Sequence, residues 1–266
     1  MDFVLFDQKW IKFLRRIWIF KFIPFVDFSL AAGSMAMGNV RSESDFDVII
    51  GARSGRIFTA RFFSVLAFGL FGWRRKKWHG QAKLKISRHR FNNFSEDGIP
   101  LAAGKVSSVR DKVCLNHFIT EKSYRLAEPH NEYWQELYRN LVPIYGEQAK
   151  IQQFWQANLE WVTDPNFHYK YENFHYKSYS FYNGSFRSSQ DDLRYIYRKP
   201  SVLTKVAKAI LEGKVGDWLE SILKRIQVKK IESGLAKQSG YKPRIVYTDQ
   251  ELEFHPDTRR IEDFLK

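Results

Sequence analysis

The chain has 266 residues, of which 44% are hydrophobic and 27% are charged, so it can bury a sizeable core and is neither disordered nor of low complexity. Its formal net charge of +14 favours a polyanionic partner, such as a nucleic acid or an anionic membrane surface. Cys114 is the single cysteine, which excludes an intrachain disulfide and a zinc site built from cysteines. We predict that it is a buried structural thiol rather than a nucleophile.

The first 120 residues alternate between helical and extended patterns. In chain order we predict a helix, two strands, a helix and a third strand, over residues 7–22, 25–33, 46–51, 57–72 and 113–120. The first helix ends before Pro24, and the first strand runs into a turn at Gly33. This alternation favours an α/β or α+β fold.

Beyond residue 120 the pattern becomes mostly helical. Apolar residues recur at helical spacing in three stretches, followed by one short β-forming stretch, at residues 133–141, 151–162, 215–226 and 244–248. We therefore predict an N-terminal α+β domain over residues 1–120 and a mostly helical accessory region over residues 121–266.

Residues 57–73 are apolar apart from Arg61 and are followed by the basic run "RRKK". A membrane span needs about 20 apolar residues, so we interpret this shorter segment as a core helix. Contact of this helix and its basic flank with a membrane surface is the alternative. Charges interrupt the first 20 residues, which lack the apolar core of a signal peptide, so we expect a cytoplasmic protein.

Two aspartates, Asp45 and Asp47, stand where the second predicted strand begins. Residues i and i+2 of a strand point to the same face, so their carboxylates lie side by side. Adjacent carboxylates repel each other unless a cation neutralises them, and magnesium or manganese bridged to a phosphate fits this pair. A solvated acidic turn, "ESDFD", is the simpler alternative.

Gly33 and Ser34 follow the first predicted strand. A glycine lets the chain turn sharply, and backbone N–H groups after such a turn, together with a serine hydroxyl, can contact phosphate oxygens. The stretch "GSMAMGNV" is not a Walker A loop, because it lacks the Lys-Ser/Thr pair.

Together these residues resemble a known signature. An apolar strand, Gly-Ser-x-Ala-x-Gly and then Ser-Asp-x-Asp opening the next strand is similar to the motif of the DNA polymerase β-like nucleotidyltransferase superfamily. The matching residues are Gly33, Ser34, Ala36, Gly38, Ser44, Asp45 and Asp47. Met37 stands where many small transferases of this family carry arginine. The resemblance covers residues 25–51, and it implies a mixed sheet with flanking helices for the N-terminal domain.

The resemblance implies a metal-dependent transferase that moves a nucleoside monophosphate from a nucleoside triphosphate (NTP) to an acceptor hydroxyl. Asp45 and Asp47 would hold Mg²⁺ or Mn²⁺, and Gly33, Ser34 and Ser44 would contact the phosphates. The acceptor is a small molecule, a protein or an RNA end; the sequence does not choose among them.

Family members usually carry a third carboxylate on a later strand, but the strand "VCLNHFI" contains no acid. We assign Asn116 to this position, and a regular strand would point His117 to the opposite face. An amide cannot accept a proton at neutral pH. A catalytically impaired nucleotide- or nucleic-acid-binding protein is therefore the second hypothesis.

The segment at residues 73–90 holds eight Lys or Arg residues and no acid. Clustered basic side chains neutralise phosphates without reading sequence, so nucleic acid is a candidate partner, and a solvated face is the alternative. The residues we assign to this polyanion contact are Arg74, Arg75, Lys76 and Lys77.

Overall fold

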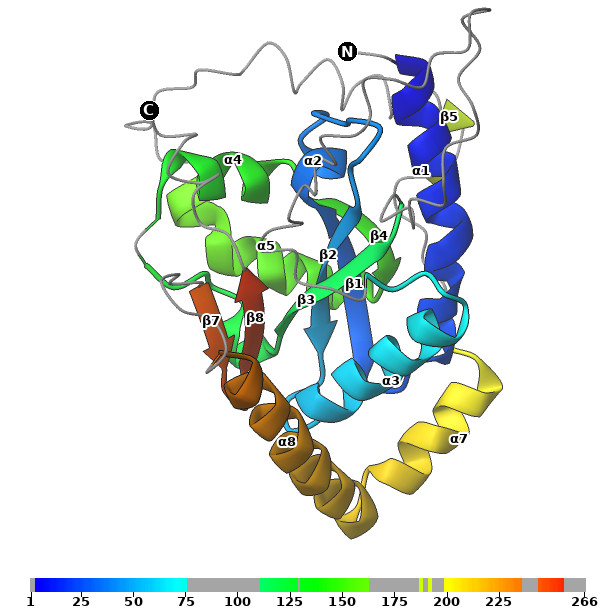
Figure 1. Ribbon diagram of the computed structural model, residues 1–266, viewed down its shortest axis with the longest axis vertical. Coiled ribbons are helices and arrows are strands. Elements are labelled where there is room, and N and C mark those ends of the chain that lie inside the picture. Colours follow the sequence, from blue (N-terminus) through cyan, green and yellow to red (C-terminus); the bar gives the residue numbers. More distant parts are fainter. Residues whose placement is uncertain are drawn as a thin grey trace, which may run out of the picture.

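The computed structural model describes residues 3–75, 111–128, 130–162, 187–188, 191–192, 199–235 and 244–255. Over these ranges the chain has an α+β fold with one six-stranded mixed sheet, in the order β4-β1-β2-β3-β8-β7 (Figure 1). Its strands are β1 (Val26–Ala32), β2 (Phe46–Ala52), β3 (Val113–Ile119), β4 (Val142–Gly146), β7 (Arg244–Tyr247) and β8 (Glu251–His255). A separate two-stranded ladder joins β5 (Arg187–Ser188) to β6 (Asp191–Asp192). The α+β class predicted from the sequence is confirmed.

Strand direction in the large sheet is mixed. β1 runs antiparallel to both β2 and β4, and β8 runs antiparallel to both β3 and β7. β2 and β3 are parallel, so the chain between them must cross over one face of the sheet. The helix α3 lies in that connection, between β2 and β3 in the chain.

Each helical stretch predicted from the sequence corresponds to a helix with different ends, and α2 and α7 were not predicted. In chain order they are α1 (Phe3–Ile17), α2 (Gly33–Ala36), α3 (Ile57–Leu70), α4 (Glu132–Arg139), α5 (Gln148–Val162), α7 (Val202–Leu211) and α8 (Lys214–Leu235). Two 3₁₀ turns are η1 (Trp18–Phe22) and η2 (Glu121–Ser123). The predicted helix at residues 7–22 is thus an α-helix that begins at Phe3 and is followed by the turn η1.

The sheet extends across the predicted boundary near residue 120. β4, β7 and β8 all come from beyond it, and they form both outer parts of the sheet. The residues of β4 follow the helix that the sequence predicts to stop before Pro143. The described part of residues 121–266 is rich in helix, but its strands complete the sheet that the first 120 residues begin.

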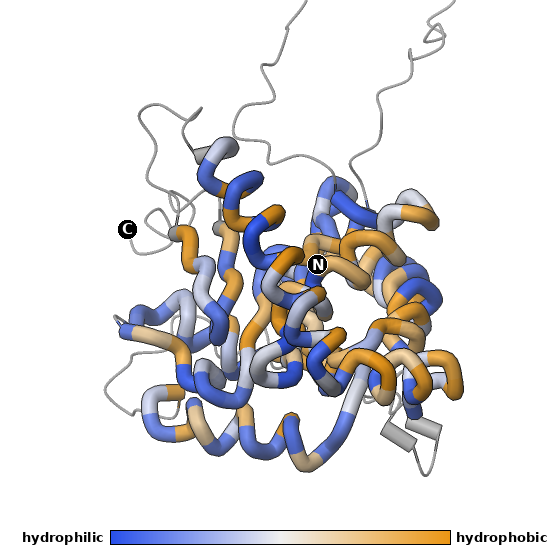
Figure 2. The backbone as a smooth tube through the Cα atoms, turned by 90° about the horizontal axis from the view of Figure 1, so that it is seen from below, coloured by the Kyte–Doolittle hydropathy of each residue, from blue (hydrophilic) through white to orange (hydrophobic). Residues whose placement is uncertain are grey.

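One face of the sheet is covered by α1, α3 and part of α8. Helix α1 contributes one apolar residue per turn to this cluster, namely Phe6, Trp10, Phe13 and Ile17, all at most 2% exposed. These residues recur at intervals of three or four, which is the spacing of one helical face. Figure 2 shows hydrophobic and hydrophilic residues alternating along the helical parts of the chain.

The other face is covered by α4 and α5. Trp134 and Tyr138 from α4 pack with Phe154 and Trp161 from α5, against Phe28 of β1. This second cluster lies on the face that also carries Ile49 of β2 and Ile119 of β3.

Helix α8 closes the N-terminal end of α3. The carboxylate of Glu220 accepts hydrogen bonds from the backbone N–H groups of Phe58 and Thr59, both at 2.8 Å, and from the Thr59 hydroxyl at 2.5 Å. The first N–H groups of a helix have no partner within it. Because the side chain of Arg56, the residue before α3, does not cap these groups, Glu220 of α8 provides the cap. Figure 1 shows α7 and α8 along the lower edge of the molecule. Among the described residues, no helix has the length and apolar character needed to cross a membrane.

Candidate functional site

The glycine and the second aspartate of the motif lie in contact at one end of the β1–β2 ladder. Ala32 pairs with Asp47, and Gly33 follows directly with a φ of +61°. A Cβ added at Gly33 would lie 2.3 Å from Oδ2 of Asp47, which is far inside van der Waals contact. The conformation and the close approach both require glycine here. The residues between Gly33 and Asp47 therefore form a loop whose two ends lie side by side.

Ser34 is the second residue of the short helix α2 and is partly buried. Ala32, the residue before α2, makes no side-chain cap. The Gly33 carbonyl accepts a hydrogen bond from Met37 N–H at 3.0 Å. The structure thus places Gly33 and Ser34 in the first turn after β1, as the sequence predicts.

Asp45 stands just before β2 and is held by two partners. Its Oδ2 lies 3.0 Å from a guanidinium nitrogen of Arg75, and its Oδ1 accepts a 3.3 Å hydrogen bond from the backbone N–H of Lys112. The Asp45 side chain is only 7% exposed. The pKa of Asp45 is raised to about 6: burial is the largest cause, Arg75 opposes the rise, and the charge of Asp47 adds to it.

Cys114 lies opposite Asp47 on the neighbouring strand. The two residues are paired in the parallel β2–β3 register, so their side chains point to the same face of the sheet. Burial raises the pKa of the Cys114 thiol, and the negative charge of Asp47 and a hydrogen bond to it raise that pKa further. The thiol is only partly buried but stays protonated at neutral pH, which agrees with a structural role.

The β3 strand is irregular, and this changes the position of His117. Asp47 pairs with Cys114, but Ile49 pairs with His117, so two steps on β2 correspond to three on β3. Such an extra residue is a bulge, and it shifts every later side chain to the other face. The expectation that His117 points away from the aspartates is therefore wrong, because it assumed a regular strand.

Asn116 falls within this irregularity rather than opposite Asp47. Its Nδ2 donates a 3.3 Å hydrogen bond to the backbone carbonyl of Phe254 on β8. The residue that pairs with Asp47 in the β2–β3 register is Cys114.

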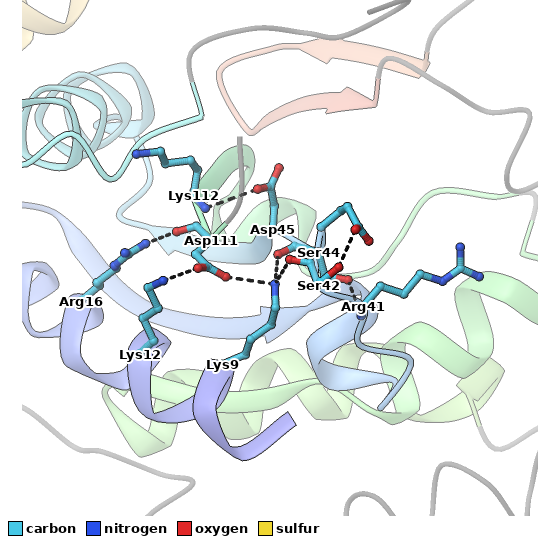
Figure 3. A network of polar contacts seen from close by, with 10 residues as sticks. Lys9, Lys12, Arg16, Arg41, Ser42, Ser44, Asp45, Asp111 and Lys112 are labelled. Atoms are coloured by element: carbon cyan, nitrogen blue, oxygen red, sulfur yellow. Dashed lines mark hydrogen bonds and ion pairs between the residues drawn. The ribbon is translucent and has the colours of Figure 1, made fainter. Parts of the chain in front are cut away.

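A buried lysine holds the chain just before Asp45. Lys9 of α1 is 4% exposed, and its Nζ donates to the carbonyls of Ser42 at 2.9 Å and Ser44 at 2.7 Å (Figure 3). The Ser44 hydroxyl accepts a 2.9 Å hydrogen bond from the backbone N–H of Arg41. In this structure Ser44 therefore shapes the turn that leads into β2.

Asp111 joins the same network from the start of β3. Its carboxylate pairs with Nζ of Lys9 at 3.0 Å and with Lys12, and its carbonyl accepts from Arg16, as Figure 3 shows. Burial acts to raise the Asp111 pKa, but the hydrogen bonds from Lys12 and Lys9 outweigh it and lower that pKa. Helix α1 thereby fixes the segments that begin both β2 and β3.

Two of the four predicted polyanion contacts lie in this region. The backbone of Arg74 forms a parallel β-bridge with Val113, and the backbone N–H of Arg75 donates to the Val113 carbonyl at 3.1 Å. The Arg75 side chain is 33% exposed and reaches Asp45. Lys76 and Lys77 lie outside the described residues.

Scans of the chain against protein-family models, curated proteins and solved structures each found no match.

The raised pKa of Asp45 predicts a pH-dependent cost of folding. Folded protein retains a proton on this carboxyl up to about pH 6, whereas the reference value is 3.8, so stability falls as pH rises between these values. Asp45→Asn removes this cost. We expect the variant to gain about 1–3 kcal/mol in unfolding free energy, relative to wild type, between pH 4 and pH 7.

The measurement is urea unfolding of both proteins in chelator-containing buffer across this range. Asp249→Asn is the matched control, because Asp249 is an exposed aspartate paired with Lys224. A wild-type-to-Asp45→Asn difference that stays constant with pH would contradict the assigned burial.

Proposed function

We propose that the chain is a metal-dependent nucleotidyltransferase of the DNA polymerase β-like type, which transfers a nucleoside monophosphate from an NTP to an acceptor hydroxyl. The observation that carries this proposal is the contact between Gly33 and Asp47, with Asp45 just before β2 and within electrostatic reach of Asp47. Gly33 and the two aspartates therefore lie together where β1 ends and β2 begins. The mixed sheet with flanking helices supports the same assignment.

The two aspartates fit a divalent cation. Asp45 is almost wholly buried and lies within electrostatic reach of Asp47, and each charge opposes ionisation of the other group. Mg²⁺ and Mn²⁺ prefer carboxylate oxygen ligands and would relieve this repulsion. When bound, such an ion neutralises the triphosphate and stabilises the attacking and leaving oxygens.

The protein residues do the positioning. Gly33 lets the Asp47 carboxylate lie directly against the turn after β1, and Ser34 supplies a hydroxyl in the same turn. In the reaction the acceptor oxygen forms a bond to the α-phosphorus while the bond to the pyrophosphate oxygen breaks. Correct alignment of these groups accounts for much of the rate of such transfers.

Arg75 links metal binding to phosphate binding. Its guanidinium pairs with Asp45 and is one-third exposed. If Asp45 held a cation, Arg75 would be available to contact the triphosphate, to which guanidinium groups bind well. Arg74 and Arg75 also contribute to the basic character expected of a site for a polyanionic substrate.

Cys114 favours a second candidate function. It occupies the place opposite Asp47 where a third carboxylate would take the proton of the acceptor, and its protonated thiol cannot accept one. A nucleotide-binding protein with little transferase activity is consistent with this residue. General-base catalysis typically contributes about 10²- to 10⁴-fold, so its loss slows transfer without preventing nucleotide binding.

The first prediction tests the metal site. Asp47→Asn should weaken magnesium-dependent binding of ATP, GTP, CTP or UTP, whichever binds best, by at least about tenfold, because the amide cannot replace an anionic ligand. Titration calorimetry with and without Mg²⁺ measures this, and Asp249→Asn is the control for loss of a carboxylate elsewhere. Equal affinity of wild type and Asp47→Asn would defeat the assignment.

The second prediction tests the position of Cys114. Cys114→Asp should release pyrophosphate from Mg-NTP faster than Cys114→Asn, by about 100-fold or more, with water as the acceptor. The two variants have side chains of nearly equal size, so their ratio isolates the proton acceptor from any effect on packing. Indistinguishable single-turnover rates would show that this position does not act on the acceptor.

A further inference from the structure

A second group of metal-binding side chains lies one strand further along the same sheet face. His117 of β3 pairs with Glu253 of β8, and Glu251 precedes Glu253 by two residues. Paired residues of adjacent strands share a face, and so do residues i and i+2 of one strand. The bulge in β3 is what turns His117 to this face.

The three side chains converge closely. One potential ligand atom from each of His117, Glu251 and Glu253 lies within 4.8 Å of the other two. Nε2 of His117 is 3.5 Å from Oε1 of Glu251. A cation between the three groups would need only small side-chain movements to reach the usual distances of about 2.0–2.2 Å.

Burial makes this cluster costly without a compensating charge. Glu253 is 0% exposed, His117 is 3% exposed, and the Glu251 side chain is 14% exposed. Two carboxylates in such surroundings raise the free energy of the folded state, since both desolvation and mutual repulsion disfavour their charged forms. A divalent cation removes both penalties.

We propose that His117, Glu251 and Glu253 form a binding site for a divalent transition-metal ion, for which Zn²⁺ is the best fit. One imidazole and two carboxylates are ligands that zinc accepts, whereas Mg²⁺ prefers oxygen ligands alone. The donor set also separates this site from the pair Asp45 and Asp47, which has no imidazole and in which Asp47 pairs with Cys114. The proposal does not depend on the transferase reaction.

The consequence of such a site is a tie between two distant parts of the chain. β8 joins β3 through the pairs from His117–Glu253 to Ile119–Glu251, and β7 joins the sheet through β8. A bound ion would add ligand bonds from both strands to this ladder. It would hold the β7–β8 hairpin on the central strands and stabilise the folded chain by mass action.

The test is zinc binding by the full chain after metal removal, measured by competition with a chromophoric chelator. Wild type should bind one equivalent, while His117→Gln and Glu251→Gln should each bind at least about tenfold more weakly. Asp47→Asn is the control on the same sheet face and should bind zinc as wild type does. Excess Mg²⁺ should not displace the zinc.

Thermal unfolding provides the second readout, because zinc should raise the Tm of wild type and of Asp47→Asn but not of the two site variants. Glu251 is the most exposed of the three residues, so Glu251→Gln keeps the test valid if His117→Gln does not fold. Unchanged zinc affinity in Glu251→Gln would overturn the proposal. So would zinc binding that Asp47→Asn abolishes, since the ion would then belong to the two aspartates.

Discussion

The contact between Gly33 and Asp47 is the constraint on which the candidate site depends. A Cβ at residue 33 would lie 2.3 Å from Oδ2 of Asp47, so any other residue would displace this carboxylate. The chain between them must leave β1 and return to β2 within a short distance, and Lys9 of α1 holds the returning segment by its carbonyls. Glycine thus allows the backbone to lie directly against the Asp47 carboxylate, which a larger residue would displace.

Charge balance is the second feature that organises this end of the sheet. The buried Asp45 is paired with Arg75, and Asp111 is paired with Lys9 and Lys12. The cost of removing buried charges from water offsets much of the attraction between them, so these pairs matter more for placing the strands than for net stability. The ion pairs of Asp111 have a structural role, because they fix α1 to the start of β3. The Asp45 pair is one that a metal ion can replace, since its cation is partly exposed.

The local elements could be predicted from the sequence, whereas the long-range pairings could not. The strands β1, β2 and β3 and the helix α3 follow from apolar runs and glycine turns. β4 and β8 join the sheet by pairing with strands that are distant in the sequence. Such pairings produce no periodic pattern of hydrophobic residues that could reveal them in the sequence. The sequence "VCLNHFI" likewise gives no sign of the bulge in β3, which decides the face of His117. The family resemblance remains a prediction.

The most direct test is a crystal structure of the chain with Mg²⁺ and a non-hydrolysable NTP analogue. The account predicts a metal ion between the carboxylates of Asp45 and Asp47, with the triphosphate against the turn at Gly33 and Ser34 and with Arg75 moved from Asp45 to a phosphate. A nucleotide bound elsewhere, with the Asp45–Arg75 pair intact, would contradict it.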